Sequence, residues 1–569
     1  MKDINLGSGF NLNLGGENME GYTPWPEEFS RMYRQKGYWL DKTISEVMDE
    51  SLARHGDRPA LIFEDGRRFT YAEMGRLVTR LALHLNALGL KLYDRVILQI
   101  PNIPEVVITY LAILKAGGIP IMALPAHREA EIGYFAKFSG ARGLAIAAHF
   151  KDFDFQEMAQ KVRDEAPGLE FVLVAGGEPK DRYFSIDQML KDPIEEYQNA
   201  AILPRPDPGL PAVFLLSGGT TGIPKLIPRT HNDYVYNFQC MADICQLNEN
   251  SVLLIAIPQG HNFALACPGL KGLLFKGGCE VLATSPAPKV MLELIERYQV
   301  THWIAVPTMI LGLLNHPQRS DYNLRSLKVI VTGGSKLNPE VALRLTPELG
   351  CEIQQVLGMA EGPLFCTRLG DPDEIENYTQ GRPISPGDEF KVVDPESRKE
   401  SPPGEVGELL CRGPYTVRGY YRALEHNAQA FSSDGFYKSG DLVRMHPSGN
   451  IIVEGRIKDC INRGGEKISA EEVENHILAH PDINNCAYVA MPDSLLGEKG
   501  CVFVVLLPGK SMTLEFLNTF LLQERKIAKF KLPEHLETVE ALPLTHVGKV
   551  NKKDLRERIA AQVAAKGKV

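Results

Sequence analysis

Short apolar runs of strand length alternate with helical patterns through most of the chain, and this alternation limits the possible folds more than any other feature. Thr70 and Glu73 have the spacing of a capping box at a helix start, and leucines at helical spacing follow them. An apolar run at 96–100, a helical stretch at 103–116 and a second apolar run at 119–124 come next. Alternating strands and helices are typical of the α/β class, so the sequence predicts an α/β protein.

The chain has 569 residues, which predicts more than one domain. Near residue 457 the pattern restarts with a helix near 470–479, strands near 486–491 and 501–507, and helices near 512–526 and 551–565. Residues 458–569 hold 16 Lys and Arg against 15 Asp and Glu, whereas the whole chain has a formal charge of −9. We therefore predict a large α/β domain at 1–457, a small α+β domain at 458–569, and a mobile tail over roughly the first 20 residues.

Composition argues against several classes of function. A net charge of −9 does not suit a protein that coats nucleic acid, because phosphate binding requires clustered Lys and Arg. The ten cysteines form no CxxC pair, which indicates reduced thiols in a cytoplasm. The chain start lacks the pattern of a signal peptide, and the apolar stretch 106–126 is interrupted by Lys115 and Pro120. We expect a cytoplasmic enzyme with no nucleic-acid or membrane partner.

Residues 211–225 read PAVFLLSGGTTGIPK, an apolar run that ends in a Gly- and Thr-rich loop. Glycines allow backbone N–H groups to approach phosphate oxygens, while Ser217 adds a hydroxyl donor and Lys225 a positive charge. The loop is not a Walker A motif, because Lys225 follows Pro224 and precedes Leu226. The pattern predicts a phosphate-binding loop; the alternative is a flexible surface loop.

The segment SGGTTGIPK resembles the phosphate loop of the adenylate-forming superfamily, which includes acyl-CoA synthetases, adenylation domains of nonribosomal peptide synthetases and luciferases. Five further signatures follow in the order that the superfamily shows: QQVLGMAEG at 354–362, GELLCRGPYTVRGYY at 407–421, YKSGDLVR at 437–444, GRIKDCINRGGEKI at 455–468 and LPLTHVGK at 542–549. The resemblance covers nearly the whole chain. It implies a large N-terminal adenylation domain and a small C-terminal domain that rotates between two half-reactions.

The resemblance also implies roles for individual residues. Glu361 is expected to bind the Mg²⁺ that bridges the ATP phosphates, since carboxylate oxygens suit this ion. Asp441 and Arg456 are expected to contact the ribose, Lys549 the acyl carboxylate and α-phosphate, and Lys458 to be the hinge. The three catalytic residues implied are thus Lys549, Glu361 and Lys225. The complete implied ATP site comprises Ser217, Gly218, Gly219, Thr220, Thr221, Gly222, Lys225, Gly333, Gly334, Ser335, Gln355, Val356, Leu357, Gly358, Met359, Ala360, Asp441, Arg456 and Lys549.

The segment 258–269, PQGHNFALACPG, resembles the stand-alone aryl-acid ligases of siderophore pathways. Asn262 can donate to or accept from an ortho-hydroxyl group on a benzoate, and Phe263 offers an apolar wall for the ring. One departure is IPQG before His261, where Met-Ala is expected. The implied aryl-acid site comprises His261, Asn262, Phe263, Cys267, Gly334, Gly358, Met359, Leu364 and Lys549.

Two side chains bear on the identity of the acid. By resemblance, Cys267 and Leu364 line the ring's 3-position, where salicylate ligases carry Cys and Leu and 2,3-dihydroxybenzoate ligases carry Ser and Val. A thiol is a weaker hydrogen-bond partner than a hydroxyl, so salicylate is expected to be preferred.

The acceptor thiol leaves alternatives open. The sequence contains no carrier domain, so an aryl carrier protein with a phosphopantetheine arm is expected to act in trans. The alternatives are a 2,3-dihydroxybenzoate ligase of the same type, and a benzoate-type ligase that passes the acyl group to free CoA. A luciferase-like oxidase is more remote. A non-catalytic nucleotide sensor is disfavoured because Lys549 and Glu361 are both present.

Overall fold

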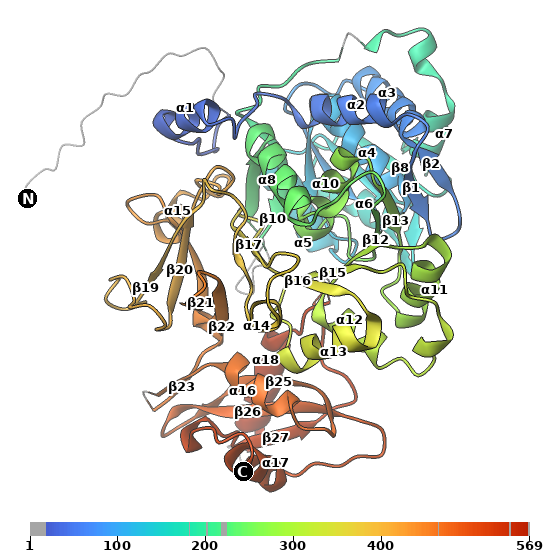
Figure 1. Cartoon of the computed structure of the whole chain (residues 1–569). Helices are drawn as coiled ribbons and strands as arrows, with labels where there is room; N and C mark the ends of the chain where they lie inside the picture. Colours follow the sequence, from blue (N-terminus) through green and yellow to red (C-terminus); the bar gives the residue numbers. More distant parts are fainter. Residues whose placement is uncertain are drawn as a thin grey trace, which may run out of the picture.

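A computed structural model describes residues 19–180, 182–200, 203–217, 225–464, 466–545 and 548–566. Figure 1 shows a large upper body, a smaller sheet beside it, and a C-terminal body below, drawn in orange and red. The expected N-terminal tail falls almost entirely on residues 1–18, which lie outside the described residues.

The large body contains a nine-stranded sheet whose central six strands, β16 to β1 in spatial order, are parallel. In spatial order its strands are β18 (Arg382–Pro383), β17 (Leu364–Cys366), β16 (Glu352–Gly358), β15 (Val329–Gly333), β14 (His302–Ala305), β12 (Val252–Ile255), β13 (Cys279–Leu282), β1 (Pro59–Phe63) and β2 (Arg68–Thr70). The carboxyl ends of β15 and β16 lie side by side, because Gly333 pairs with Val356. In parallel sheets this edge is where ligands bind.

A second sheet of seven strands is parallel except at one edge, where β10 and β11 form an antiparallel pair. Its order is β11 (Leu226–Thr230), β10 (Pro211–Leu216), β4 (Ile119–Met122), β3 (Arg95–Gln99), β5 (Gly143–Ala147), β8 (Phe171–Ala175) and β9 (Phe184–Ser185). The predicted phosphate loop connects β10 to β11. The strands expected at 96–100 and 119–124 are therefore confirmed.

Helices α3 (Tyr71–Ala87) and α4 (Pro104–Lys115) belong to the apolar core shared by the two sheets. The capping box predicted at Thr70 and Glu73 is present: Thr70 accepts from the backbone N–H of Glu73, and Glu73 accepts from that of Thr70. Every residue of α4 from Pro104 to Leu114 is buried, which explains the apolar stretch without a membrane. The described residues include no helix long and apolar enough to cross a bilayer.

The other helices of the large body cover the sheets or connect their strands. Those on the outer face of the seven-stranded sheet are α5 (Glu129–Ser139) and α6 (Phe155–Glu165). The remainder are α1 (Glu27–Gln35), α2 (Ile44–His55), α7 (Ile186–Lys191), α8 (His231–Ile244), α9 (Asn262–Ala266), α10 (Gly269–Lys276), α11 (Pro288–Tyr298), α12 (Pro307–Leu314), α13 (Pro339–Leu349), α14 (Asp373–Tyr378) and α15 (Leu424–Ala430), with a small hairpin of β6 (His149–Phe150) and β7 (Phe153–Asp154).

An antiparallel four-stranded sheet leads to the C-terminal body. Its strands are β19 (Glu389–Val393), β20 (Gly407–Arg412), β21 (Tyr437–Met445) and β22 (Ile451–Arg456). A single 3₁₀ turn, η4 (Ile457–Asp459), follows β22 at the expected domain boundary. The boundary at 457 and 458 and the rotation about it stay predictions.

The C-terminal body packs three helices on a five-stranded sheet, and its elements confirm those expected after residue 470. The strands are β23 (Ile461–Arg463), β24 (Glu466–Ile468), β25 (Ile483–Asp493), β26 (Gly497–Leu506) and β27 (His535–Thr538), and the helices are α16 (Ala470–Leu478), α17 (Leu514–Gln523) and α18 (Lys552–Lys566). Strands β25 and β26 extend further than expected. The two form one continuous antiparallel pair that runs close to the turn between them.

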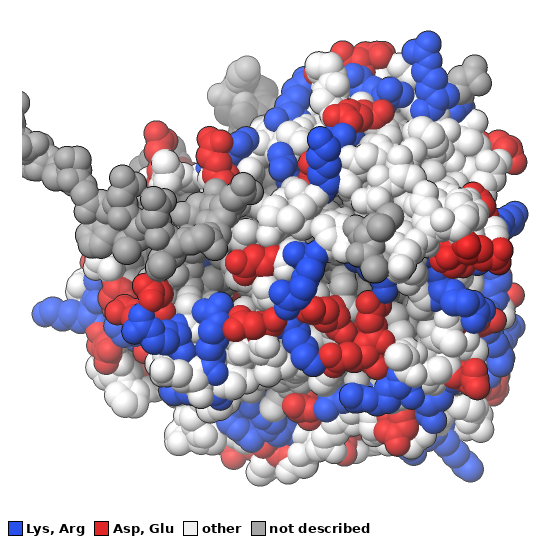
Figure 2. All heavy atoms as spheres, turned by 90° about the horizontal axis from the view of Figure 1, so that it is seen from above, with Lys and Arg blue, Asp and Glu red and all other residues white. Residues whose placement is uncertain are grey.

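Figure 2 shows the molecule from above, with basic and acidic side chains interspersed over this face rather than gathered by sign. This face is therefore mixed in charge among the residues drawn in colour.

Candidate active site

Two glycines at the end of β15 form the floor of the site. Gly334 has a φ of +88°, a conformation that favours glycine. A methyl group at Gly334 would lie 3.0 Å from Lys549 Cε, and one at Gly333 would lie 3.5 Å from Phe263 Cζ. The absence of side chains here therefore allows the predicted catalytic lysine and the predicted ring-binding aromatic residue to approach the same strand end.

Lys549 belongs to the C-terminal body but lies against the large body. Its loop is closed by two hydrogen bonds with Thr545: the Lys549 N–H donates to Thr545 Oγ1 at 3.1 Å, and the Thr545 N–H donates to the Lys549 carbonyl at 2.6 Å. The hydroxyl group of Thr308, in the first turn of α12, donates to the Gly548 carbonyl at 3.0 Å. These contacts hold the lysine across Gly334.

Burial, together with the positive charges of Arg456 and Lys458, lowers the pKa of Lys549 to about 8, and the negative charge of Asp441 opposes this shift. Asp441 is 2% exposed, and Arg456 Nε donates to its Oδ1 at 2.8 Å. Its second oxygen, Oδ2, is buried with no hydrogen-bond partner among the described residues. The Asp441 carboxylate is thus close to three cationic side chains, so the net charge around it is positive. Its Oδ2 atom remains available as a hydrogen-bond acceptor.

The two ends of the predicted phosphate loop are joined by hydrogen bonds. The Ser217 N–H donates to the Lys225 carbonyl at 3.0 Å, and the Lys225 N–H donates to Ser217 Oγ at 2.9 Å. This pair continues the β10–β11 ladder by one step. The residues between them, 218–224, lie outside the described residues. Five of them were predicted to belong to the ATP site: Gly218, Gly219, Thr220, Thr221 and Gly222.

Glu361 is 8% exposed, and its Oε1 accepts a hydrogen bond from the Tyr420 hydroxyl group at 2.6 Å. No group of three or more His, Cys, Asp or Glu that could hold a metal occurs among the described residues. A single oriented carboxylate fits a Mg²⁺ that arrives on ATP, because this ion keeps waters and phosphate oxygens as its other ligands. The donor set therefore suits Mg²⁺ bound with its nucleotide.

The aryl-acid candidates lie next to this floor. Leu364, at the start of β17, is 2% exposed, and a methyl group at Gly358 would lie 2.5 Å from its Cδ2. Asn262 and Phe263 open the short helix α9, which His261 caps by accepting the Phe263 N–H at Nδ1. Burial lowers the pKa of His261 to about 3, with Lys549 adding to the shift, so its ring is neutral at pH 7.

The remaining predicted ATP-site residues lie along β16 and in the turns that follow β15 and β16. Ser335 follows the glycine turn, and Val356 packs against Gly333 across the strand pair. The Gln355 side chain instead donates to the carbonyls of Glu376 and Asn377, inside the protein. Leu357, Met359 and Ala360 complete the segment between β16 and Glu361.

Sequence reasoning missed three polar contacts of the site. The Tyr234 hydroxyl group donates to Asn262 Oδ1 at 2.5 Å, Tyr420 holds Glu361, and Thr308 holds the lysine loop. Tyr420 lies within the signature GELLCRGPYTVRGYY, so the sequence did indicate that this segment belongs to the site. Tyr234 and Thr308 lie in none of the motifs that the sequence analysis identified.

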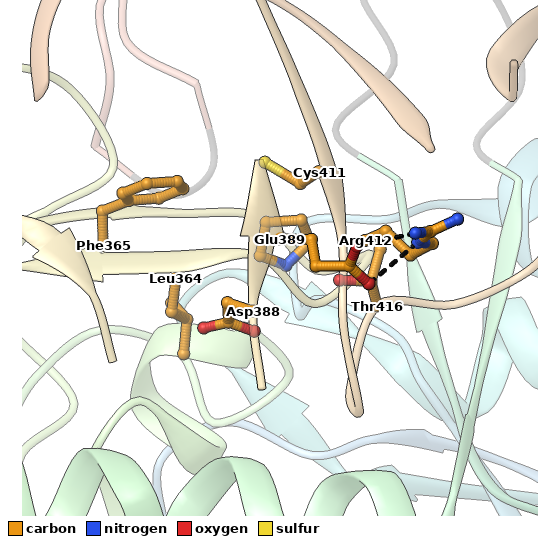
Figure 3. A pocket seen from close by; sticks show the side chains of 8 residues that line it. Leu364, Phe365, Asp388, Glu389, Cys411, Arg412 and Thr416 are labelled. Carbon is orange, nitrogen blue, oxygen red and sulfur yellow. Dashed lines mark hydrogen bonds and ion pairs between the residues drawn. The ribbon is translucent and has the colours of Figure 1, made fainter. Parts of the chain in front are cut away.

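A small cavity lies beside Leu364, between β17 and the sheet of β19 and β20 (Figure 3). Arg412 and Glu389 form an ion pair of 2.6 Å on its wall, and burial raises the pKa of Asp388 to about 7. Of the predicted site residues that the structure describes, only Leu364 lines this cavity. We therefore assign the site to the ends of β15 and β16.

The fold and this arrangement define a class: a two-domain enzyme in which a lysine from the second body lies against a strand-end glycine floor, and its charge acts on a buried aspartate that an arginine pairs. The family model described as AMP-binding enzyme matches residues 48–421, and the model described as AMP-binding enzyme C-terminal domain matches residues 472–549. The chain therefore belongs to the AMP-binding enzymes, and ATP is the nucleotide that such adenylating enzymes use.

Individual relatives narrow the comparison. The chain is 46% identical to a salicylyl-CoA synthase / salicylate adenylyltransferase of Streptomyces sp. (95% of this chain, 97% of the relative). It is 42% identical to a 2,3-dihydroxybenzoate-AMP ligase of Bacillus subtilis (96% and 99%). The apo structure of Mycobacterium smegmatis MbtA superposes with a TM-score of 0.71 at 41% identity (95% and 99%). The predicted family and fold class are thereby confirmed.

Proposed function

We propose that the protein uses ATP to activate salicylate as salicyl-AMP and then transfers the acyl group to the phosphopantetheine thiol of an aryl carrier protein in siderophore biosynthesis. The observation that carries this proposal is the position of Lys549. It lies across Gly334, and its charge acts both on the buried Asp441 and on His261, which caps the helix of Asn262 and Phe263.

In the first half-reaction a carboxylate oxygen of the acid attacks the α-phosphorus of ATP. A bond forms between that oxygen and phosphorus, and the bond to the bridging oxygen breaks to release pyrophosphate. The attacking carboxylate is already an anion at neutral pH, so no general base is required; the enzyme must offset repulsion between two anions and align them. Lys549 contributes charge at the α-phosphate, and Lys225 stands at the edge of the loop that would bind the departing pyrophosphate.

Different residues would bind the ribose of the nucleotide and the metal ion. The free Oδ2 of Asp441 can accept from a ribose hydroxyl group while Arg456 holds Oδ1. Glu361, oriented by Tyr420, would hold Mg²⁺, which shields phosphate charge when bound.

In the second half-reaction the thiol sulfur bonds to the acyl carbon, the bond from that carbon to the phosphate oxygen breaks to release AMP, and the thiol proton passes to solvent. Lys549 occupies the floor of the site in this structure, so it would leave before a pantetheine arm enters along that side. Lys458, in the 3₁₀ turn η4 after β22, is the proposed hinge.

Cys267 and Leu364 support salicylate over 2,3-dihydroxybenzoate. Both are buried, so a 3-hydroxyl group would meet a thiol and a methyl group rather than a strong hydrogen-bond partner. The second candidate acid is 2,3-dihydroxybenzoate, named in the Bacillus relative. Free CoA is the second candidate acceptor, named in the Streptomyces relative. A location in the cytoplasm is part of the proposal.

The test of this proposal is ATP–pyrophosphate exchange across a panel of hydroxybenzoates, followed by thioester formation with free CoA and with a phosphopantetheinylated aryl carrier protein. We expect exchange to be fastest with salicylate and the thioester to form on the carrier protein. Exchange that no hydroxybenzoate supports would contradict the proposed acid class, and transfer to free CoA alone would contradict the proposed acceptor.

The substitution Lys549→Ala should impair the first half-reaction and spare the second. Acyl-AMP formation should fall by about 10²–10³-fold, the usual effect of losing one transition-state charge contact. Thioester formation from supplied salicyl-AMP should stay close to wild type. Equal damage to both half-reactions would contradict the domain-rotation account.

A further inference from the structure

Four buried side chains, two of them in the proposed aryl-acid site, form one chain of hydrogen bonds with a fixed direction. The Tyr234 hydroxyl group donates to Asn262 Oδ1 at 2.5 Å, Asn262 Nδ2 donates to Cys267 Sγ at 3.4 Å, and the Cys267 thiol donates to Asn237 Oδ1 at 3.6 Å. All four residues are at most 8% exposed. Each member thus presents a defined donor or acceptor to the next.

The direction of this chain fixes how the Asn262 amide is turned. If the amide were flipped, its NH₂ group would face the Tyr234 hydroxyl group, and that O–H would lose its buried acceptor, which is costly. In the observed orientation Oδ1 is engaged by Tyr234, and one of the two N–H groups is engaged by Cys267. The second N–H group remains as a donor.

Tyr234 is itself held firmly. Two basic side chains contact its ring, with Lys271 Nζ 3.0 Å and Arg229 Cζ 4.5 Å from the ring centroid, and Lys271 Nζ donates to the Tyr110 hydroxyl group at 3.1 Å. Burial raises the pKa of Tyr234 well above its ordinary value, so the hydroxyl group keeps the proton that it donates.

We infer that Tyr234 is a specificity-determining positioning residue: it turns the Asn262 amide so that the pocket donates a hydrogen bond to the ortho substituent, and therefore selects an ortho oxygen over an ortho amine. This inference rests on the proposed function and concerns the same pocket. In salicylate the 2-hydroxyl proton can bond to the neighbouring carboxylate, which leaves its oxygen free to accept from Asn262. In 2-aminobenzoate the amino lone pair is delocalised into the ring, so the group is a donor and a poor acceptor.

The experiment compares kcat/KM for ATP–pyrophosphate exchange with salicylate, 2-aminobenzoate and benzoate. In Tyr234→Phe the ring keeps its contacts with the two basic side chains, but Asn262 Oδ1 loses its donor and the amide can turn. We expect the ratio of salicylate to 2-aminobenzoate to fall about tenfold or more, because a site built to hydrogen-bond one group discriminates strongly against its analogue. Benzoate, which has no ortho group, should change by less than about twofold.

Tyr236→Phe is the matched control. Tyr236 lies two residues further along α8, and its hydroxyl group bonds to Ser385 Oγ at 2.7 Å. The ratio should stay at the wild-type value in this variant. A ratio unchanged in Tyr234→Phe, or an equal loss with all three acids, overturns the inference and leaves the proposed function intact. Failure of the wild-type protein to activate salicylate instead overturns the proposed function.

The Asn262→Asp variant provides a second test of the inference if Tyr234→Phe does not fold. The aspartate side chain offers oxygen acceptors in place of the N–H donor, so preference should move from salicylate towards 2-aminobenzoate. An Asn262→Asp variant that keeps the wild-type ratio would show that the amide donor does not select the acid.

Discussion

The ionisation of Lys549 gives a sharp test of its role. Burial beside Arg456 and Lys458 lowers its pKa from the usual 10.5 to about 8 in the ligand-free site. At 1.36 kcal/mol for each pH unit, holding the ammonium group there costs about 3 kcal/mol. If the proposed role is correct, kcat/KM for adenylation falls as the pH rises through about 8, because the free enzyme loses the cation that offsets the anions. Between pH 8.5 and pH 9.5 the loss should be about eightfold for a single deprotonation.

The assay is pyrophosphate exchange at low concentrations of ATP and salicylate, repeated at saturation. Bound phosphates favour the charged form, so the decline in kcat should move to higher pH than the decline in kcat/KM. Lys549→Arg should remove the decline over this interval, since a guanidinium group stays charged. Lys549→Ala should be low and flat. An alkaline decline that persists in Lys549→Ala would assign it to another group and refute the reasoning.

Three further changes test separate parts of the site. Lys458→Pro fixes a backbone angle at the proposed hinge and should impair one half-reaction selectively; normal rates for both would place the hinge elsewhere. The double change Cys267→Ser with Leu364→Val should move kcat/KM towards 2,3-dihydroxybenzoate by about 10–100-fold relative to salicylate, and a wild-type preference for the dihydroxy acid would contradict the pocket assignment. Thr308→Val removes the donor to the Gly548 carbonyl and should slow adenylation by about 5–10-fold. Thioester formation from supplied salicyl-AMP should not change in this variant, and an equal effect on both steps would show a general loss of stability.

The local sequence pattern was sufficient to predict much of the secondary structure. The capping box at Thr70 and Glu73, the buried helix α4 and the elements after residue 470 all follow from spacing and periodicity within a few residues. Strand alternation could also have indicated that Gln355 and its neighbour Val356 point to opposite faces of β16. Only Val356 packs against Gly333.

Contacts between distant segments could not be predicted in this way. Tyr234 and Asn262 are 28 residues apart, and Thr308 and Gly548 are 240 residues apart. Sequence spacing gives no distance between such segments, since packing of whole elements decides which side chains meet. The motifs therefore named the chemistry of the site, whereas the side chains that orient Asn262 and the lysine loop required the three-dimensional arrangement.

If the C-terminal body rotates as proposed, the seating of Lys549 on Gly334 makes closure of the enzyme without nucleotide a step that releases protons. An exposed lysine is almost fully protonated at pH 8, whereas the seated lysine, with a pKa of about 8, is half protonated. Closing should therefore release about half a proton per molecule at that pH, and closure without nucleotide should become more favourable as the pH rises. When ATP binds, the proton returns from the buffer. The heat of ATP binding measured by calorimetry at pH 8 should accordingly depend on the ionisation enthalpy of the buffer, and this dependence should vanish in Lys549→Ala.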